Sequence, residues 1–451
     1  MKSISVFGIG KLGFPIIACF AKHGYRVIGF DINPDVVKSV NEKRPLIYEP
    51  GLTELLQKSE GISATDDYLY AVNNSEATFI VVATPSQADG SFSTEYAEAA
   101  AEQIASGIRN KDSYHLVILT STVLPGVTQG KIKTILEKTS GKKCGQDFGL
   151  CYNPEFIALG TVIHDFLNPD VVLIGESDKK AGDLLSEMYK NVCENDPPIV
   201  RMSINSAELA KISLNAFVTM KISFANTIAE LCEHIPDGDS EAISRMLGLD
   251  SRIGRKYLSG ALAYGGPCFP RDNKAFAFFT RQIGCDARLA EATDTENRHQ
   301  NDRILSIIKQ KIGNVRDKKI AILGLTYKPN TDVIEESAAV KIADALLQQG
   351  AHLSIYDPAA MENARRILGD RDIRYTASAK ECLKGAELCI LATPWPEFKD
   401  LKPEDFLNSM QRPVILDCWR FFDTTGYTEK IEYTTIGLYS GGEYEKYVRN
   451  E

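Results

Sequence analysis

A glycine-rich turn near the amino terminus constrains the fold of this chain more than any other feature. Residues 8–13 read Gly-Ile-Gly-Lys-Leu-Gly and lie between the apolar run 3–8 and a helical pattern over 14–23. Gly8 permits the tight turn, Gly10 lets a pyrophosphate approach the backbone, and Gly13 lets the helix pack on the strand. Amide groups at the start of the helix bind phosphate. We therefore predict dinucleotide contacts at Gly8, Gly10, Lys11, Leu12 and Gly13.

A single acidic residue indicates which dinucleotide. Asp31 ends the next strand-like run, residues 25–31. A carboxylate at this place accepts hydrogen bonds from a ribose 2′-hydroxyl and repels a 2′-phosphate, so the expected cofactor is NAD and not NADP. The alternative is that Asp31 only caps the following helix. Thr84, Pro85 and Thr122 follow later strands, at the edge where open α/β sheets bind ligands, and are further predicted cofactor contacts.

The order of apolar patterns predicts the rest of the architecture. Strand-like runs at 77–84 and 115–120 alternate with a helical pattern at 96–107, and 148–152 and 171–175 are candidates for the same sheet. Such alternation is typical of a doubly wound sheet. Residues 205–233 contain no Gly or Pro and predict one long helix, followed by helical segments at 243–247 and 272–283. A second α/β pattern has strands at 319–325, 352–357, 387–393 and 413–417, with a helix at 337–349.

The predicted fold class is therefore α/β. Two Rossmann-like doubly wound domains are joined by a long central helix and a helical dimerisation domain. We predict an NAD-binding domain at 1–200, a central helical domain at 201–300 and a second Rossmann-like domain at 301–451. A length of 451 residues agrees with about three domains.

Composition excludes several classes of protein. The formal charge of −9 argues against binding to nucleic acid or to an anionic membrane. No apolar run approaches the ~18–20 residues of a membrane span, and the first residues read as a strand instead of a signal peptide. The ten cysteines are scattered without a C-x-x-C pair, so we expect no metal and a reducing, cytoplasmic location.

One cysteine differs from the others. Cys268 lies between Gly-Gly-Pro and Phe-Pro-Arg-Asp, so it must be on a loop or just before a helix. Helix dipoles and Arg271 would lower the pKa of its thiol there. Cysteines inside apolar segments, such as Cys19 and Cys389, are better explained as small buried hydrophobic residues. A nucleophilic thiol beside a nicotinamide cofactor suggests oxidation of an aldehyde through a thioester.

Many ordered motifs now point to one family. They are Gly-Ile-Gly-Lys-Leu-Gly, Glu49-Pro50-Gly51-Leu52, Thr84-Pro85, Ser121-Thr122-Val123, Asn153-Pro154-Glu155-Phe156, Glu208-Leu209-Ala210-Lys211 with Asn215, Asp250 with Arg252-Ile253-Gly254, the Cys268 segment, Tyr327-Lys328-Pro329 and Tyr356-Asp357-Pro358. With them the chain resembles the UDP-glucose/GDP-mannose dehydrogenases over nearly its whole length.

The resemblance implies a chemistry and a set of catalytic residues. The family oxidises a sugar C6 alcohol to a carboxylate and consumes two NAD. The resemblance makes Cys268 the nucleophile, Lys211 the charge that stabilises the C6 oxyanion, and Glu155 the general base. Asp272 would position a water with Lys211, and Asn215 and Thr122 would complete the set. From the residues alone, Lys211 and Asn215 could equally be a solvated helix face, and Glu155 an ordinary acid at the start of a helix.

The resemblance also implies a substrate, a UDP-sugar, and its contacts. In the second α/β section Gly324 is followed by Leu-Thr-Tyr-Lys and not by a phosphate loop, so a cation would hold the diphosphate. By resemblance Lys328 and Arg420 contact phosphate and sugar, and Arg252 reaches the partner's substrate in a homodimer built on the long helix. The remaining substrate contacts are Glu155, Phe156, Lys211, Asn215, Lys221, Tyr257, Gly265 and Phe269.

The sequence departs from the family at three places. Ala158 and Glu335 stand where the family usually has arginine, and Arg271 stands where lysine is common. A glutamate near a phosphate-bearing cofactor predicts weaker NAD binding or a changed closure between domains. Arg271 keeps the charge with a different geometry.

The sequence leaves alternatives to this sugar and to this function. UDP-glucose is favoured over GDP-mannose by Phe269 and over a UDP-N-acetylhexosamine by Pro267. A nucleotide-sugar binding protein without turnover would explain Ala158 and Glu335, but not an intact Cys268 set. A β-hydroxyacid dehydrogenase would leave the third section and Cys268 unexplained.

Overall fold

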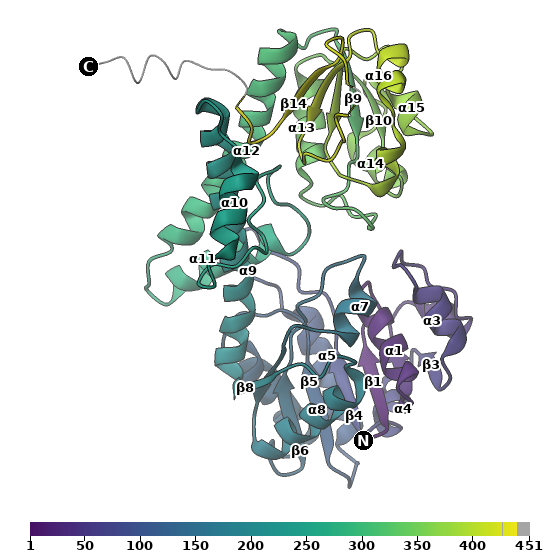
Figure 1. Cartoon of the computed structure of the whole chain (residues 1–451). Helices are drawn as coiled ribbons and strands as arrows, with labels where there is room; N and C mark the ends of the chain where they lie inside the picture. Colours follow the sequence, from purple (N-terminus) through teal and green to yellow (C-terminus); the bar gives the residue numbers. More distant parts are fainter. Residues whose placement is uncertain (426, 440–451) are drawn as a thin grey trace. The chain divides into compact units, whose positions relative to one another are not determined.

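The computed structural model describes residues 1–425 and 427–439, which form two compact units (Figure 1). The units divide between Leu214 and Asn215, inside the long helix α9 (Ile204–His234). This helix confirms the one predicted over 205–233. The division of the chain into three domains stays a prediction.

An eight-stranded sheet forms the centre of residues 1–214, in the order β3-β2-β1-β4-β5-β6-β7-β8. Neighbouring strands are parallel except β6 and β7, which are antiparallel. The strands are β1 (Ser3–Phe7), β2 (Arg26–Phe30), β3 (Ile62–Thr65), β4 (Ala77–Ile80), β5 (His115–Leu119), β6 (Phe148–Tyr152), β7 (Val172–Glu176) and β8 (Ile199–Ser203). The helices are α1 (Gly13–Lys22), α2 (Pro34–Asn41), α3 (Leu52–Lys58), α4 (Tyr68–Asn73), α5 (Glu95–Ile108), α6 (Lys133–Ser140), α7 (Val162–Leu167) and α8 (Lys179–Val192), with a π-helical turn at Val127–Ile132.

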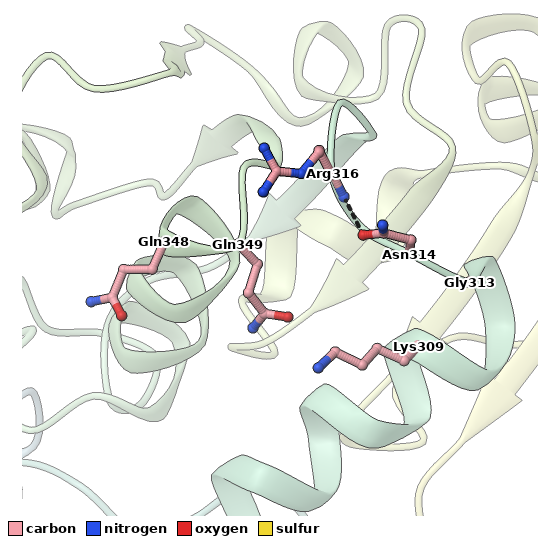
Figure 2. Close-up of a pocket in the computed structure, with 6 residues that line it drawn as sticks. All are labelled: Lys309, Gly313, Asn314, Arg316, Gln348 and Gln349. Carbon is pink, nitrogen blue, oxygen red and sulfur yellow. Dashed lines mark hydrogen bonds between the residues drawn. The ribbon is translucent and has the colours of Figure 1, made fainter.

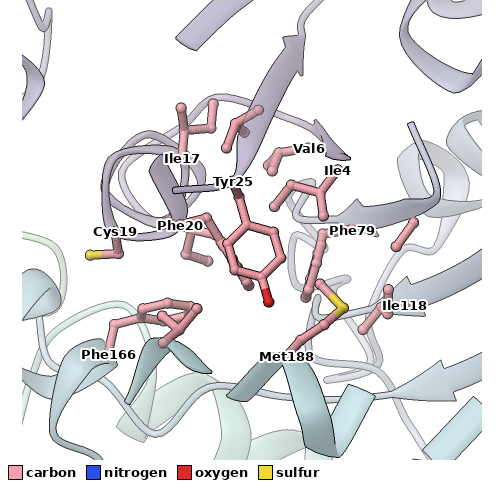
Figure 3. Close-up of a cluster of buried hydrophobic side chains, with 14 of the residues drawn as sticks. Ile4, Val6, Ile17, Cys19, Phe20, Tyr25, Phe79, Ile118, Phe166 and Met188 are labelled. Carbon is pink, nitrogen blue, oxygen red and sulfur yellow. The ribbon is translucent and has the colours of Figure 1, made fainter. Parts of the chain in front are cut away.

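Both faces of this sheet are covered, as the continuous apolar strands predict. One core joins the sheet to α1, α7 and α8, and the other joins it to α4, α5 and α6. Figure 3 shows the first core, in which the ring of Phe20 packs against Tyr25, Phe79 and Phe166.

A six-stranded parallel sheet forms the centre of the second unit, within its described residues 215–425 and 427–439. Its order is β11-β10-β9-β12-β13-β14, the same as that of the first six strands of the other sheet. The strands are β9 (Lys319–Leu323), β10 (His352–Tyr356), β11 (Ile373–Tyr375), β12 (Leu388–Leu391), β13 (Val414–Asp417) and β14 (Glu432–Thr435). The helices after α9 are α10 (Ser240–Leu249), α11 (Phe269–Gln282), α12 (Arg288–Ile312), α13 (Ala338–Gln348), α14 (Met361–Leu368), α15 (Ala379–Cys382) and α16 (Pro403–Ser409), with a 3-10 turn at Pro396–Asp400.

The second sheet also has a core on each face. Helices α12, α13 and α14 cover one face, and α15 and α16 cover the other. Each sheet therefore has the strand order of a dinucleotide-binding fold. The predicted fold class, two Rossmann-like parts with a long helix between them, is confirmed.

Two differences from the predicted elements have a physical reason. The apolar run 77–84 predicts one strand, but β4 ends at Ile80 because the chain then leaves the sheet at its carboxyl edge. Helix α12 was not predicted because half of its buried residues are polar, among them Asn297, Gln300 and Arg303. Among the described residues, no helix is long and apolar enough to cross a membrane.

A buried ion pair connects the helices of the second unit to its sheet. Arg303 of α12 is paired with Glu233 of α9, and both side chains are almost fully buried. Glu233 also accepts a hydrogen bond from the backbone N–H of Gly437, just after β14. The pair therefore joins two helices to the end of a strand.

Removing one partner of this pair tests its contribution to stability. Glu233→Ala leaves the Arg303 guanidinium buried without its carboxylate, a change that costs about 3–5 kcal/mol. Trp395 and Trp419, the two tryptophans of the chain, both lie in the second unit, so their fluorescence reports its unfolding in urea. We expect a clearly lower midpoint.

Asp344→Ala is the matched control, because Asp344 pairs with Arg371 on the surface of the same unit. An exposed pair contributes less than about 1 kcal/mol. Equal midpoints for the two variants would contradict the importance of the buried pair.

Candidate functional site

The glycine turn has the geometry that the sequence predicts. Gly8 has a φ of +95°, and a Cβ atom built there would lie 2.7 Å from the Val81 carbonyl oxygen. A Cβ atom at Gly13 would lie 2.0 Å from the Gly8 oxygen, whereas one at Gly10 meets no atom within 4 Å. Gly8 and Gly13 are therefore required by packing, and Gly10 leaves the backbone open. Helix α1 begins without a side-chain cap and without an acidic residue in its first turn, so neither competes there with a bound anion.

A cavity of about 280 Å³ adjoins this turn in the first unit. Asp31 lines it and accepts hydrogen bonds from Ile9 N (2.8 Å) and Asn33 N (2.9 Å). The helix cap is Asn33, which accepts from Asp35 N, so capping α2 is not the role of Asp31. The lining residues are Phe7, Gly8, Gly10, Phe30, Asp31, Ile32, Val81, Val82, Ala83, Tyr96, Ala99, Ala100 and Gln103.

These groups fit NAD. The open backbone at Gly10 and the uncapped start of α1 suit a pyrophosphate, and Asp31 keeps lone pairs for a ribose. Ile32 is 77% exposed, so the cavity has an apolar side chain at its rim, as an adenine ring needs. Bound there, NAD supplies a hydride acceptor.

The other predicted cofactor contacts lie at the carboxyl edge of the same sheet. The Thr84 hydroxyl donates to the Thr122 carbonyl oxygen (2.8 Å), and the Ser121 hydroxyl donates to the Val82 carbonyl oxygen (2.6 Å). These bonds join the loops after β4 and β5. Pro85 follows Thr84 and is exposed, and Lys11 is exposed within the glycine turn.

Glu155, Phe156 and Lys211 lie together in the first unit. The Lys211 ammonium donates to the Glu155 carbonyl oxygen (2.7 Å) and lies 4.9 Å from the centre of the Phe156 ring. Lys211 is buried, which excludes a solvated helix face, and Glu155 lies in a loop, which excludes an acid at a helix start. Burial raises the pKa of Glu155 to about 7, while a hydrogen bond from Tyr189 and the charge of Lys211 act in the opposite direction.

A second buried carboxylate holds the loop that carries Glu155. Glu49 accepts hydrogen bonds from the backbone N–H groups of Gly160 (2.9 Å) and Val162 (2.7 Å). Glu49 therefore holds the end of this loop, residues 160–162, at the start of α7. Ala158, at one of the family departures, lies in this loop, where its N–H donates to Asp165 (3.2 Å).

Cys268, Asp272 and Asn215 lie together in the second unit. Cys268 is exposed and is the N-cap of α11, as predicted for a thiol just before a helix. One turn later Asp272 has no exposed surface, and it accepts hydrogen bonds from Asn215 (2.6 Å) and Arg271 (2.9 Å). An exposed thiol thus lies one helical turn before a buried carboxylate, which is held by an amide and a guanidinium.

Two asparagines hold the loop before Cys268. Asn226 accepts from Ala261 N (2.8 Å) and donates to Leu262 O (3.3 Å). Asn297 accepts from Tyr264 N (2.8 Å) and donates to Tyr264 O (3.0 Å). Sequence reasoning missed both residues. They lie on α9 and α12, and no local pattern connects them to the cysteine.

The same loop packs on the second sheet's carboxyl edge. A Cβ atom at Gly265 would lie 2.4 Å from the Glu336 carbonyl oxygen, and one at Gly266 would lie 2.7 Å from the Tyr327 ring. Gly266 N also donates to the Glu335 carbonyl oxygen (3.0 Å). Glu335, the other departure, therefore lies beside the cysteine loop within this unit. Lys328 follows Tyr327 and is partly buried.

The turn of the second sheet that corresponds to the glycine turn is filled by protein. Asp357 directly follows β10, as Asp31 directly follows β2. Its carboxylate accepts from the backbone N–H groups of Leu325, Thr326, Ala359 and Ala360 and from the Trp395 indole. This carboxylate is saturated, so a ribose cannot bind there as it can at Asp31.

The remaining predicted substrate residues lie elsewhere in the second unit. Lys221 donates to the Ile253 and Gly254 carbonyl oxygens, and exposed Arg252 is paired with Asp250. The Tyr257 ring contacts Phe269, with centroids 6.1 Å apart. Arg420 has a φ of +52° and is paired with Asp239 (2.5 Å). Their roles in substrate binding stay predictions.

A second hollow has a different character. Figure 2 shows this open, polar hollow, where α12 and α13 end. Its lining residues are Lys309, Gly313, Asn314, Arg316, Gln348 and Gln349. Its cations, Lys309 and Arg316, lie near the carboxyl ends of two helices, where positive charge compensates the helix dipole. We assign it no catalytic role.

Comparison with known proteins identifies the relationship. Residues 2–193 match the NAD binding domain of the UDP-glucose/GDP-mannose dehydrogenase family, residues 205–299 its central domain and residues 321–424 its UDP binding domain. The chain is 37% identical over 418 residues to UDP-glucose 6-dehydrogenase AglM of Haloferax volcanii, covering 92% of this chain and 96% of that protein. It is 33% identical to UDP-glucose 6-dehydrogenase TuaD of Bacillus subtilis, covering 92% and 89%.

A solved structure supports the same family relationship. A UDP-glucose dehydrogenase from Pyrobaculum islandicum superposes with a TM-score of 0.87 and is 36% identical, covering 98% of this chain and 97% of that one. The resemblance seen in the sequence and the NAD cofactor are therefore confirmed. With an NAD site built as its motifs require and three matched domains, the chain is an NAD-dependent oxidoreductase that belongs to the UDP-glucose/GDP-mannose dehydrogenase family.

Proposed function

We propose that this protein oxidises the C6 alcohol of a UDP-sugar, most specifically UDP-glucose, to the carboxylate with two NAD. The observation that carries the proposal is Cys268, an exposed thiol at the start of α11 above the buried Asp272–Asn215 pair. A simple alcohol dehydrogenase needs no such nucleophile. The two relatives reported above are named for UDP-glucose, which supports this sugar.

The chemistry has four balanced steps. The C6 alcohol loses a hydride to one NAD and its hydroxyl proton to a base, which gives an aldehyde. The Cys268 thiolate adds to the aldehyde carbon, and protonation of the oxygen gives a thiohemiacetal. Loss of a second hydride to a second NAD, and of the hydroxyl proton, gives a thioester. Water adds to the thioester carbon, the C–S bond breaks, the sulfur is protonated to regenerate the Cys268 thiol, and the carboxylate is released while one further proton goes to a base.

The residues of the first unit support the proton and charge steps. A carboxyl group whose pKa is about 7 exchanges protons readily near neutral pH, which suits Glu155 as general base. The buried ammonium of Lys211 suits stabilisation of the C6 oxyanion. Thr122 lies at the carboxyl edge of the sheet and joins this set by family resemblance.

The residues of the second unit support nucleophile and substrate binding. Asp272 is held rigidly by Asn215 and Arg271, as a group that positions the hydrolytic water must be. The saturated turn at Asp357 leaves Lys328 as the cation for the diphosphate, because backbone amides there are already paired. Phe156, Lys221, Arg252, Tyr257, Gly265, Phe269 and Arg420 complete the proposed substrate contacts.

The stoichiometry of NADH tests the reaction. We expect two NADH per molecule of UDP-glucose, and less turnover of GDP-mannose and UDP-N-acetylhexosamines in the same assay. Cys268→Ser removes the thiolate, so we expect turnover to fall at least about 1000-fold. A serine hydroxyl stays protonated near neutral pH and is then a weak nucleophile.

Cys285→Ser is the matched control, because Cys285 is also exposed in the same unit and follows the end of α11. It should retain wild-type turnover. One NADH per sugar, or full uronate production by Cys268→Ser, would refute the thioester route.

Cofactor preference tests the role of Asp31. Asp31→Ala removes the acceptor for the ribose hydroxyls and the charge that repels a 2′-phosphate. Hydrogen bonds to a charged group contribute about 1.5–3 kcal/mol, so kcat/KM for NAD should fall about tenfold or more relative to NADP. Steady-state kinetics with both cofactors measures this, and exposed Asp35→Ala is the control. An unchanged NAD preference would remove Asp31 from the site.

We also propose a homodimer through α9. Phe217, Phe224 and Leu231 lie seven residues apart on this helix and are each more than half exposed. Residues at this spacing share one helix face, and a single apolar stripe of this kind suits a second copy of the same chain about a two-fold axis.

Phe224→Glu tests the dimer. A carboxylate in the middle of the stripe would have to be buried at the interface, so we expect the protein to become monomeric in light scattering after size exclusion. Leu289→Glu, an exposed apolar residue on α12, should leave the mass unchanged. A monomeric wild-type chain would contradict the proposal.

A further inference from the structure

The side chain of Glu155 is part of a hydrogen-bond chain that the sequence did not reveal. Tyr189 Oη on α8 lies 2.7 Å from Glu155 Oε1 and 2.5 Å from Asn153 Oδ1. Both contacts are within hydrogen-bond distance. A phenol carries one hydrogen, so Tyr189 can donate to only one of these two oxygens at a time.

The orientation of Asn153 is fixed by a third group. Its Nδ2 donates to the Leu173 carbonyl oxygen on β7 (2.9 Å), and the side chain is almost fully buried. The amide oxygen must therefore face Tyr189, where it can only accept. When Tyr189 donates to Asn153, the proton between Tyr189 and Glu155 has to come from Glu155.

The chain thus has two states that differ by one proton. With Glu155 protonated, Glu155 donates to Tyr189 and Tyr189 donates to Asn153. With Glu155 ionised, Tyr189 turns and donates to the carboxylate, and the buried Asn153 oxygen loses this donor. A buried acceptor without a donor is unfavourable, so Asn153 favours the protonated state of Glu155, whereas the hydroxyl of Tyr189 favours the ionised state.

We propose that Tyr189 and Asn153 are positioning residues that set the proton affinity of Glu155 through the rotation of one hydroxyl group. The proposal rests on the role of Glu155 as general base given above. It adds a switch made of two side chains that need not touch the substrate, and whose effects on Glu155 are opposite.

The thiols and the phenol around Glu155 do not themselves change charge near pH 7. Within the first unit Lys211 of α9 lies beside the Glu155 backbone and favours ionisation, and the thiols of Cys19 on α1 and Cys193 after α8 also interact with Glu155. Burial raises the pKa of both thiols, that of Cys193 to about 12, so they stay neutral near pH 7. Burial and the neighbouring carboxylate also raise the pKa of Tyr189, so its hydroxyl reorients without losing its proton.

The two residues give opposite expectations for the pH dependence of kcat/KM. Tyr189→Phe removes the donor to the carboxylate, so the acid limb should move up by about one pH unit, a loss of about tenfold below pH 7. Asn153→Ala removes the competitor for the hydroxyl, so the acid limb should move down. In the double variant the limb should match Tyr189→Phe, because Asn153 acts only through Tyr189.

Tyr25→Phe is the matched control, because Tyr25 belongs to the same hydrophobic core. Its acid limb should stay at the wild-type position. Shifts of both variants in the same direction, or an Asn153 effect that persists in the Tyr189→Phe background, would overturn the proposal. The two single variants are expected to move the acid limb in opposite directions. If one of them misfolds, the direction of the shift in the other still tests the proposal.

An infrared titration of the Glu155 carboxyl separates this inference from the proposed function. Glu155→Gln identifies the carboxyl band, and its midpoint should move up in Tyr189→Phe and down in Asn153→Ala. This measurement needs no turnover. A protein that oxidises no UDP-sugar but shows these shifts would refute the function and support the switch, and turnover with unmoved midpoints would do the reverse.

Discussion

Backbone amides at the carboxyl edges of the parallel strands in the two sheets need acceptors, and buried carboxylates supply them. At Asp31 two backbone amides are satisfied and lone pairs remain for a ribose. At Asp357 four backbone amides and an indole occupy the same kind of carboxylate. Two sheets with one strand order therefore differ in what they can bind, because one acceptor is saturated by protein and the other is not.

The same interaction positions the candidate site residues. Glu49 holds the loop that carries Glu155 by accepting two of its backbone amides, and Asp272 is held by an amide and a guanidinium below Cys268. Helix α9 contributes Lys211 to the first unit and Asn215 to the second, one helical turn apart. A chain with a net charge of −9 thus places cations such as Lys211 and Arg271 next to specific oxygens, although it has no overall positive charge.

Sequence reasoning succeeded where the physical requirement is local. The roles of Gly8 and Gly13 depend on contacts within one turn and its neighbouring strand. The long helix over 205–233 is predicted by apolar residues at helical spacing without an interrupting Gly or Pro. It failed where polar side chains are buried in a helix and where an apolar run continues beyond the end of a strand. Helix α12 buries Asn297 and Arg303 together with its isoleucines, so no apolar period marks it, and β4 ends at Ile80 although the apolar run continues.

The sequence by itself determined the dinucleotide turn, the α/β order and the family, because each rests on residues that are neighbours along the chain or on motifs in a fixed order. Only the tertiary structure decided that Glu155 meets Tyr189 and Asn153, that Asn226 and Asn297 hold the cysteine loop, and that the turn at Asp357 is closed. The physical reason is common to all three. Hydrogen bonds between distant segments depend on how helices pack on a sheet, and the proton affinity of a buried carboxyl depends on which donors that packing brings to it.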